Sequence, residues 1–414
     1  MESPTALPLS PYRVLDLTDE KGILCGKILA DLGADVIKVE RPGGDPSRNI
    51  GPFYHDIPDP EKSLFWFAFN TNKRSITLDI KTADGQKIFK KLVERADFVV
   101  ESFPPGYLRE LGLDYPVLSE INPRIIMTSI TPFGQDGPYQ NYKCSDLIAS
   151  AMGGLSYICG DPDRPPVRIS AEQAYSHAGS QAAVATLIAN HYRQATGEGQ
   201  HIDVSIQECI VWTLMYTIPY WDFGKRPFPR SGNLQSRYSV NYHMVFPCKD
   251  GWISCRLLTG LTWGRHQRAL VAAMDSEGMA ADLKEVDWDR LSYDERPQQD
   301  IDHWEEVTMK YFKKHTKAEL LEKAREWGLM ISPVNSTEDI LQYQQLQERD
   351  YWARVDHPEL GTVISYPGNY FKSTQPSWRI KRAPLIGEHN LEVYEQELGL
   401  SRKEIITLKE GGII

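Results

Sequence analysis

The sequence predicts an α/β protein built around a doubly wound parallel sheet. Short apolar segments of strand length alternate with segments of helical length along the first half of the chain. The 414 residues, 41% of them hydrophobic, can bury a large core and are enough for two lobes or more. This alternation is typical of parallel sheets with helices on both faces, so we expect a large α/β lobe and a smaller second one.

The first elements form a strand, helix and strand. RVLDL at 13–17 predicts a strand, 26–31 is part of a helix, and ADVIKV at 34–39 predicts a second strand. This order is Rossmann-like, but the turn DEKGILCG lacks G-x-G-x-x-G, and only Glu40 fits the dinucleotide-binding pattern. A nicotinamide-dependent dehydrogenase is therefore not favoured.

The alternation then continues to residue 130. The following segments are predicted as strands at 75–79, 98–101 and 124–130, and as helices at 85–95 and 107–111. Basic residues fall in the connecting loops, where they could contact phosphate groups of a ligand. They are Arg41 and Arg48 in RPGGDPSR, and Lys73 and Arg74 in NTNKRS.

A buried helix is predicted at 177–193, where small and apolar residues recur at helical spacing before the stop signal Gly-Glu-Gly. The loop that leads into such a helix is where α/β folds gather reacting groups, so 168–177 is the first place to look for chemistry. It contains Glu172, Tyr175, Ser176 and His177. A strand at 201–205 and one apolar, aromatic-rich helix at 206–223 follow.

The chain divides near Gly224, where KRPFPRSGN interrupts regular structure. The smaller region that follows contains a hairpin at 244–255, an amphipathic helix at 261–273 and an acidic surface segment at 275–302. The remainder returns to α/β character and ends in a helix. We therefore expect three segments: 1–224 as the N-terminal part of the large lobe, 225–325 as a small α+β lobe, and 326–414 returning to the large lobe.

Composition excludes several classes of partner. The net charge is −10 with both signs mixed along the chain, which argues against a nucleic acid or an anionic membrane. No apolar run approaches the roughly 18 residues of a membrane span, and no signal peptide is apparent, so we expect a cytoplasmic protein. The six cysteines form no CxxC pair, which predicts reduced core thiols, with neither a metal site nor disulfides.

Several separated motifs resemble the class III CoA-transferases, the family of carnitine and formyl-CoA transferases and methylacyl-CoA racemase. They begin with VLDLT and ADLGADVIKVERPGGDPSR and continue through NTNKRSITLDIK, ADFVVESFPPG, INPRIIMTSITPFGQDGPY, TGEGQHIDVSIQE and RAPLIGEH. The resemblance extends from about residue 12 to the C-terminus. It implies that two chains thread through each other as interlocked rings, and that coenzyme A (CoA) or acyl-CoA is a substrate.

The resemblance also implies particular CoA contacts in this chain, which would recognise phosphate and adenine. By motif position they fall on Arg41, Leu78, Phe103 and Leu111, with Lys73 and Arg74 in the matching basic loop. Acidic residues stand at two other positions of the implied cleft, Glu20 and Glu110. Because they repel CoA phosphates, we expect the cleft to be weak or empty.

The central departure from the family lies at Tyr175. The family's PVRxxxxxxD motif carries a nucleophilic aspartate, and PVRISAEQAY places Tyr175 there. The carboxylate attacks the acyl-CoA thioester, becomes a mixed anhydride, and is converted by the freed CoA into an enzyme-CoA thioester. A phenol with a pKa of about 10 is mostly un-ionised at neutral pH and has no carbonyl to carry CoA. Tyr175 cannot perform this step.

Three hypotheses follow. The leading one is a subunit of a heteromeric enzyme that moves CoA between a dicarboxylic acyl-CoA, such as succinyl-CoA, and an organic acid, aromatic acids included. A homologous partner would supply the aspartate, as in a two-subunit family member that acts on benzylsuccinate in anaerobic toluene breakdown. The second is a self-sufficient enzyme that uses Glu172, and the third is a non-enzymatic acyl-CoA-binding homologue. The racemase branch is not favoured, because its acid/base pair corresponds to Ser145 and Tyr175.

Overall fold

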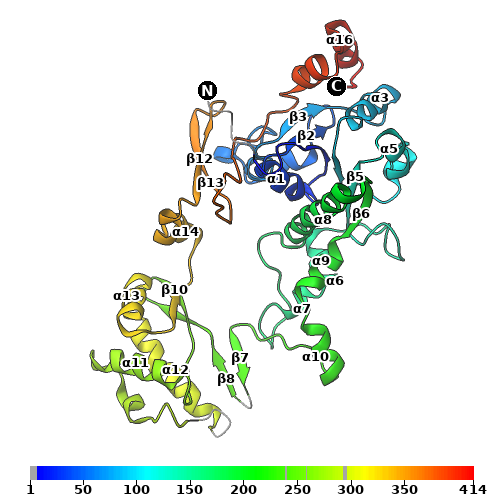
Figure 1. The fold of residues 1–414 in the computed structure, drawn as a ribbon. Coiled ribbons are helices and arrows are strands. Elements are labelled where there is room, and N and C mark those ends of the chain that lie inside the picture. Colours follow the sequence, from blue (N-terminus) through cyan, green and yellow to red (C-terminus); the bar gives the residue numbers. More distant parts are fainter. Residues whose placement is uncertain (1–6, 238–239, 258, 292–295) are drawn as a thin grey trace. The chain divides into compact units, whose positions relative to one another are not determined.

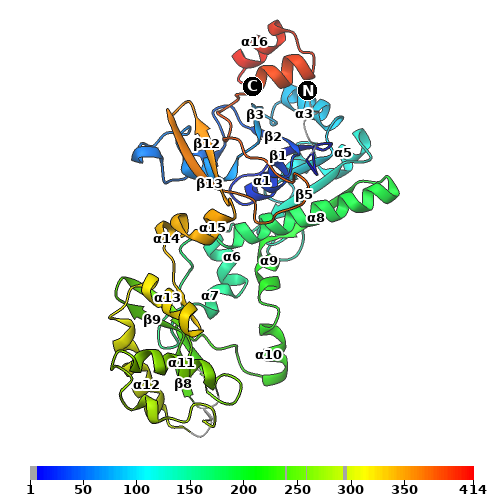
Figure 2. The ribbon, with the colours of Figure 1, turned by 60° about the vertical axis from the view of Figure 1, so that its left-hand side comes forward.

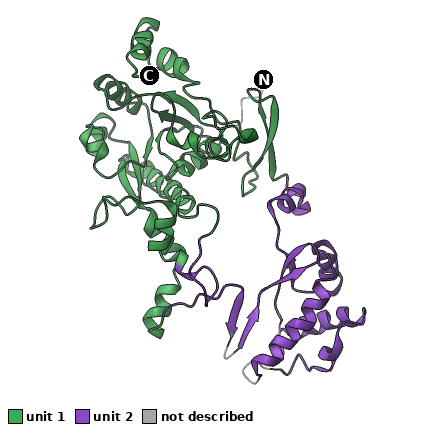
Figure 3. Ribbon diagram, turned by 180° about the vertical axis from the view of Figure 1, so that it is seen from behind, with its two compact units in different colours: residues 1–156, 168–226, 350–414 green, residues 157–167, 227–349 purple. Residues whose placement is uncertain are grey.

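The chain forms two compact units, coloured separately in Figure 3. This computed structural model describes residues 7–237, 240–257, 259–291 and 296–414. Unit 1 comprises residues 1–156, 168–226 and 350–414, and unit 2 comprises residues 157–167 and 227–349. The sequence-based division placed the return to the large lobe at residue 326. Unit 2 instead extends to Arg349, and the pairing of β11, Ile331–Pro333, with β10, Gly251–Cys255, places the chain after residue 326 in the sheet of unit 2.

Unit 1 contains the predicted parallel sheet (Figure 1). Its six strands lie in the order β3-β2-β1-β4-β5-β6, and every neighbouring pair is parallel. This is the doubly wound order with a switch point between β1 and β4, so the predicted fold class is confirmed. The strands are β1 Arg13–Leu17, β2 Asp35–Glu40, β3 Arg74–Thr77, β4 Phe98–Glu101, β5 Ile126–Thr131 and β6 Gln200–Ser205.

Helices cover both faces of this sheet, which explains why its strands read as continuous apolar runs. Successive strand residues point to opposite faces: Val14 packs in the cluster that contains α1 and α8, and Leu15 in the cluster that contains α3. The 23-residue α8 packs along β5 and β6 through small residues, and Figure 2 shows its length. The helices that cover the sheet are α1 Ile23–Asp31, α3 Ala83–Val93, α5 Tyr115–Ile121 and α8 Ala174–Thr196.

The predicted single helix at 206–223 is two helices, α9 Ile206–Thr213 and α10 Thr217–Gly224. Pro219 explains the interruption, because its ring would clash with the carbonyl of residue 215 in a continuous helix. A turn closes at this point, where Thr217 N–H donates to the Leu214 carbonyl at 2.9 Å. The remaining elements of unit 1 are α2 Leu64–Phe69, α4 Tyr107–Glu110, α6 Asp146–Met152, β12 Trp352–His357, β13 Thr362–Pro367, a helical segment at Glu392–Glu397, and α16 Arg402–Glu410; α7 Leu155–Ile158 spans the boundary with unit 2.

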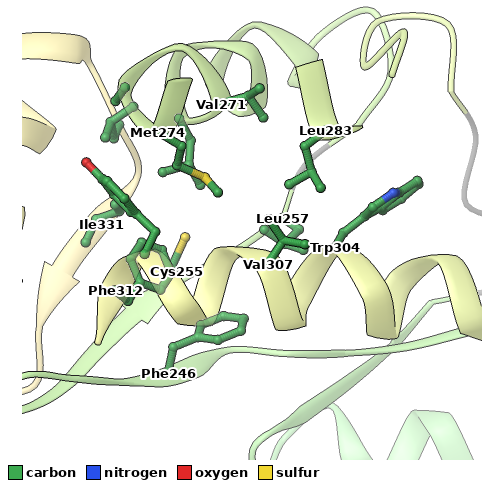
Figure 4. Close-up of a cluster of buried hydrophobic side chains, with 14 of the residues drawn as sticks. Phe246, Cys255, Leu257, Val271, Met274, Leu283, Trp304, Val307, Phe312 and Ile331 are labelled. Carbon is green, nitrogen blue, oxygen red and sulfur yellow. The ribbon is translucent and has the colours of Figure 1, made fainter. Parts of the chain in front are cut away.

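Unit 2 has its own hydrophobic core. The predicted hairpin is confirmed as β9, Val245–Cys248, paired antiparallel with β10. Phe246 and Phe312 meet edge to face within this core, with ring centroids 5.7 Å apart, and Figure 4 shows the side chains around them. Within the acidic segment, Leu283 and Trp288 are buried, and residues 292–295 lie outside the described residues. The other elements are β7 Leu234–Arg237, β8 Val240–His243, α11 Gly264–Asp275, α12 Gln298–Phe312, α13 Lys317–Trp327, α14 Thr337–Gln342 and α15 Gln344–Glu348.

A buried ionic network joins the three strands β1, β2 and β3. Asp16 accepts a hydrogen bond from Lys73 Nζ at 2.8 Å, and Lys38 Nζ lies 3.8 Å from the other carboxylate oxygen of Asp16. Lys38 also pairs with Asp45 at 3.1 Å. Burial raises the pKa of Asp16, but attraction to Lys73 and Lys38 outweighs it and lowers the pKa overall. The network therefore keeps a carboxylate ionised inside the core.

A second buried pair closes the loop after β2. Glu40 binds Arg48 through both carboxylate oxygens, with Nε to Oε2 at 2.6 Å and Nη2 to Oε1 at 2.8 Å. Arg48 Nη2 also donates to the Pro384 carbonyl at 3.0 Å, which ties the C-terminal segment to the sheet. The guanidinium lies over the Trp66 ring, 3.7 Å from its centroid.

We expect Lys73→Met to lower the free energy of unfolding by about 3–5 kcal/mol, because it leaves the buried Asp16 carboxylate without its nearest cation. The folded-state pKa of Asp16 is lowered, so the stability that it contributes is present at neutral pH and is lost as pH falls through that value. Urea denaturation at pH 7.5 measures the change. The control is Lys87→Met, which removes an exposed pair with Asp84 and should cost less than ~1 kcal/mol. An equally small effect for Lys73→Met would contradict the role of the network.

Candidate active site

A cavity of about 230 Å³ lies at the carboxyl ends of β1, β2, β3 and β4. This is the edge of a doubly wound sheet, beside the switch point, where ligands bind. Each of the four strands contributes residues at or just after its last position. The lining residues are Leu17, Asp19, Val39, Arg41, Asp45, Pro46, Leu78, Asp79, Ile80, Lys81, Ser102, Phe103 and Tyr107.

The cavity combines an aromatic wall with charged groups of both signs. The rings of Phe103 and Tyr107 lie 4.7 Å apart between centroids. Arg41 and Lys81 are its cations, and the Arg41 Nε donates to the Gly44 carbonyl at 3.2 Å. Three carboxylates, Asp19, Asp45 and Asp79, also line it. An aromatic base with phosphate groups is a chemical match for the ring wall and the two cations, whereas the carboxylates oppose an anion.

The structure brings together three of the six residues expected to contact CoA. Arg41, Leu78 and Phe103 line the cavity. Leu111 instead packs at the edge of the hydrophobic cluster beneath α3. Sequence reasoning missed Ile80, Lys81 and Tyr107, although all three follow closely after predicted strands, and position after a strand end is the signal that could have identified them.

Lys73 and Arg74 do not line this cavity. The Lys73 ammonium donates to Asp16 and to the Ile23 carbonyl, at 2.8 and 3.0 Å. The Arg74 guanidinium binds Asp35, Glu392 and Glu397. Burial is the main cause that lowers the pKa of Lys73, and Asp16 opposes it. Both side chains are therefore occupied by structural ion pairs on β1, β2 and the C-terminal segment.

Tyr175 lies in the first turn of α8 and is buried. Its backbone N–H donates to Asp146 Oδ1 at 3.0 Å, which fixes the start of α8 against α6. Burial raises the pKa of its phenol, and the neighbouring Glu20 carboxylate raises it further. The hydroxyl is therefore protonated at neutral pH, so this position holds neither a carboxylate nor a phenolate.

Close packing of α8 on α1 explains why the β1–α1 loop lies near the start of α8. A Cβ on Gly179 would lie 2.8 Å from the Leu24 Cβ, so glycine is needed at this contact. The β1–α1 loop, with Asp19 and Glu20, thereby approaches the start of α8.

The fallback residue Glu172 is exposed and lies outside α8, before its first turn. Partial desolvation of its carboxylate by the surrounding loops raises the pKa of Glu172, and repulsion from Asp146 and Glu20 adds to the shift. Burial likewise raises the pKa of Glu20, with Asp19 as the next cause. Ser145 accepts a hydrogen bond from the Ile148 N–H and caps α6. The structure therefore gathers Glu172, Glu20 and Asp146 around Tyr175.

Glu101, which sequence reasoning did not select, lies beneath the cavity at the end of β4. It accepts a hydrogen bond from the Phe103 N–H at 2.7 Å and so shapes the turn that carries the aromatic wall. Burial raises its pKa to about 7, although hydrogen bonds from Ser129 and Phe103 oppose the shift. A buried carboxyl that titrates near neutral pH is a feature common at functional sites.

Within the described part of the chain, no group of three or more His, Cys, Asp or Glu side chains could hold a metal ion. In that same part, no helix has the length and apolar character needed to cross a bilayer.

Comparison with known proteins gives one family. The model described as CoA-transferase family III matches residues 9–390. Subunit BbsE of succinyl-CoA:(R)-benzylsuccinate CoA-transferase from Thauera aromatica is 35% identical over 411 residues, which are 98% of this chain and 98% of the relative. Formyl-CoA:oxalate CoA-transferase from Streptomyces avermitilis is 33% identical, covering 98% of this chain and 99% of the relative. A solved CAIB/BAIF family protein from Brucella suis has a TM-score of 0.83 at 27% identity, covering 95% of this chain and 100% of that one.

We expect Glu101→Gln to stabilise the protein more at pH 8 than at pH 5. The raised folded-state pKa means that the folded protein binds more protons than the unfolded chain between about 4.5 and about 7, so this carboxyl costs stability as pH rises. Glutamine keeps the acceptor for the Phe103 N–H and removes the charge. Urea denaturation at both pH values should show a relative gain on the order of 2 kcal/mol. The exposed Glu94→Gln is the control, and an equal effect of Glu101→Gln at both pH values would refute the assignment.

Proposed function

The chain belongs to CoA-transferase family III, and we propose that it is the subunit of a heteromeric CoA-transferase that lacks the covalent nucleophile. The observation that carries the proposal is Tyr175, a buried tyrosine with a protonated hydroxyl, which stands where the PVRxxxxxxD resemblance implies an aspartate. A homologous, aspartate-bearing partner then supplies the carboxylate. The similarity of this chain, over nearly its full length, to a relative named as a subunit supports the proposal.

The chemistry of CoA transfer requires a carboxylate in one of the two chains. The carboxylate oxygen attacks the thioester carbonyl and CoA leaves as a thiolate, which produces a mixed anhydride. The thiolate then attacks the enzyme's own acyl carbon and releases the original acid, so that CoA is held as an enzyme thioester. An incoming acid reverses these steps and leaves with CoA. The Tyr175 phenol has no acyl carbon, so it cannot hold CoA.

The substrates that we propose follow the relatives. The CoA donor is a dicarboxylic acyl-CoA such as succinyl-CoA, and the acceptor is an organic acid, with an aromatic acid as the first candidate. We assign the cavity of this chain to the CoA nucleotide, with Arg41, Leu78 and Phe103 as its contacts. The lining carboxylates oppose the CoA phosphates, although Asp45 is already paired with Lys38, so we expect that binding to be weak. Lys73 and Arg74 act from outside the cavity by holding the sheet.

The assembly that we propose is the interlocked pair of chains that the family resemblance implies, formed with the aspartate-bearing homologue. Exposed apolar side chains on three consecutive helices of unit 1 support it: Ile188 on α8 is 65% exposed, Trp212 on α9 60%, and Phe223 on α10 91%. Apolar exposure on this scale is unusual for a monomer and is typical of an obligate interface. All six cysteines are free thiols, which supports a reducing compartment, the cytoplasm.

Two alternatives have specific observations in their favour. Glu172 carries a carboxylate three residues before Tyr175, which makes it the fallback nucleophile of a self-sufficient enzyme. A non-enzymatic acyl-CoA-binding homologue is favoured by the cavity together with the missing nucleophile. The variants below separate these alternatives.

We expect the partner's aspartate, and not this chain, to carry the covalent step. In the co-purified complex, changing that aspartate to alanine should lower turnover by several orders of magnitude, because no acyl group remains to hold CoA. Tyr175→Phe should cost at most about threefold, since the ring still packs and only a hydroxyl is lost. Steady-state rates and mass spectrometry of the trapped thioester provide the measurements.

Glu172→Gln is the matched test of the self-sufficient alternative. It preserves size and removes only the charge, so rates and the trapped thioester should stay unchanged. Loss of both in Glu172→Gln, with activity retained when the partner's aspartate is removed, would overturn the proposed division of labour. Failure of every complex to transfer CoA would favour the non-enzymatic homologue.

We also expect this chain to bury on the order of 2,000 Å² or more with a partner of the same fold. Ile188→Asp places a charge on the exposed apolar face of α8 and should shift the complex toward separate chains in native mass spectrometry. Ile406→Asp is the control, because Ile406 is 56% exposed on α16, outside this face. A compact, stable monomer of the unmodified chain at micromolar concentration, even with the partner present, would contradict the assembly.

A further inference from the structure

A second pocket of unit 1 lies at the amino ends of β2 and β3, whereas the cavity lies at the carboxyl ends of the strands. The second pocket has a volume of about 450 Å³ and includes Asp35 and Arg74, the first residues of β2 and β3. The C-terminal segment 379–392 forms much of its wall. The lining residues are Asp35, Asn72, Lys73, Arg74, Arg379, Lys381, Arg382, Pro384, Glu388, His389 and Glu392.

Asn72 binds the backbone of the C-terminal segment through three hydrogen bonds. Its backbone N–H donates to the Lys381 carbonyl at 3.2 Å, and its side-chain Nδ2 donates to the Arg379 carbonyl at 2.9 Å. The Lys381 N–H donates back to Asn72 Oδ1 at 2.7 Å. Three hydrogen bonds therefore fix the backbone that carries Arg379 and Lys381, so the position of these two residues in the wall is built by the fold.

The other charges of the pocket are paired. Arg74 binds Asp35 and Glu392, at 2.7 and 2.9 Å. Arg382 donates to Glu388 through both of its terminal nitrogens, Nη1 and Nη2. These pairs use all three lining carboxylates, and the Lys73 ammonium is taken by Asp16.

Arg379 and Lys381 differ from these groups. Their side chains make no ion pair or hydrogen bond with any residue that the structure describes, although both line the pocket. The pocket therefore carries two positive charges that have no counter-ion among the described residues. A ligand with two negative charges would neutralise them.

His389 adds a neutral donor to the same wall. The Ser75 N–H donates to its Nδ1 at 3.1 Å, so Nδ1 is the unprotonated nitrogen and the proton lies on Nε2. Burial lowers the pKa of His389, although Glu388 opposes the shift, which keeps this tautomer neutral at pH 7. Its Nε2–H has no acceptor among the described residues and is available to an oxyanion.

We propose that this pocket binds a small dianionic oxyanion, either a phosphate group or a dicarboxylate, through Arg379, Lys381 and the Nε2–H of His389. The site is separate from the proposed CoA cavity, and its existence does not depend on the proposed function. A bound dianion joins three side chains of the C-terminal segment, which is held to β3 by the hydrogen bond from the Ser75 N–H to His389. It therefore stabilises unit 1 by mass action, which gives a readout that needs no catalysis.

The test is thermal unfolding of the full chain, free of CoA, at pH 7.5 and constant ionic strength. Inorganic phosphate and succinate are titrated separately, with sodium chloride as the ionic-strength reference. We expect at least one of the two anions to raise Tm along a saturable curve that chloride does not reproduce. A response to phosphate alone identifies a phosphate site, and a response to succinate alone identifies a dicarboxylate site.

The double variant Arg379→Gln/Lys381→Gln should weaken the apparent affinity for that anion at least tenfold. It leaves the backbone bonds to Asn72 in place, so the variant without ligand should keep the Tm of the unmodified chain. Lys313→Gln/Lys314→Gln removes two exposed lysines from unit 2 and should leave the titration unchanged. Arg41→Gln, in the cavity, should also leave it unchanged, which separates this site from the proposed function.

Two results would overturn the proposal. One is that neither anion raises Tm beyond the chloride reference. The other is a saturable response that persists undiminished in the Arg379→Gln/Lys381→Gln variant. Both are independent of whether the partner's aspartate carries CoA.

Discussion

The buried charge network around Asp16 is the constraint on which unit 1 depends. A carboxylate inside a core must be paired, and Asp16 obtains its partners from Lys73, before β3, and from Lys38 in β2. The sheet order, the position of α1 and the loop after β2 must all satisfy that need together. Gly26 shows how tight the arrangement is, because a Cβ there would lie 2.1 Å from Asp16 Oδ2. Replacing the whole network with apolar groups could preserve stability, but removing one member cannot.

This constraint changes what the family's motifs mean. The aspartate of VLDLT, the lysine of DVIKVE and the lysine of NTNKRS form the network, and the glutamate of DVIKVE binds Arg48. These residues bind one another and fix β1 against β2 and the start of β3. The cavity residues Arg41 and Leu78 directly follow β2 and β3, and Phe103 follows β4. The motifs therefore support the site more than they contact a ligand.

The start of α8 does not depend on which side chain stands at position 175. Tyr175 is buried, and its backbone N–H is bound by Asp146, an interaction available to any residue except proline. Its ring occupies space that a small carboxylate would leave. In the function that we propose, the chain keeps the architecture and its aspartate-bearing partner performs the covalent step. Hydrogen bonds also hold the C-terminal segment to the sheet of unit 1. The Pro384 carbonyl accepts from Arg48, and His389 accepts from the Ser75 N–H.

The sequence by itself determined the class of fold and the central chemical fact about this chain. Strands such as β1 and β2 were predictable because apolar runs and their flanking turns are encoded by neighbouring residues. The break at Pro219 was also readable, since proline acts on the carbonyl four residues before it, yet the prediction gave one helix. The absence of a carboxylate at Tyr175 needs no structure, because one residue type excludes the chemistry.

Only the tertiary structure decided which basic residues line the cavity. Arg41 and Arg74 look alike in the sequence, each following or opening a strand beside a polar loop. Arg74 is taken by Glu392 and Glu397, more than 300 positions away, whereas Arg41 lines the cavity. Arg379 and Lys381 lie just before the RAPLIGEH motif, in a segment with no sequence signal of a site. They form a cationic wall only because Asn72 binds their backbone. Charge pairing depends on contacts that the fold creates, and local sequence patterns do not encode those contacts.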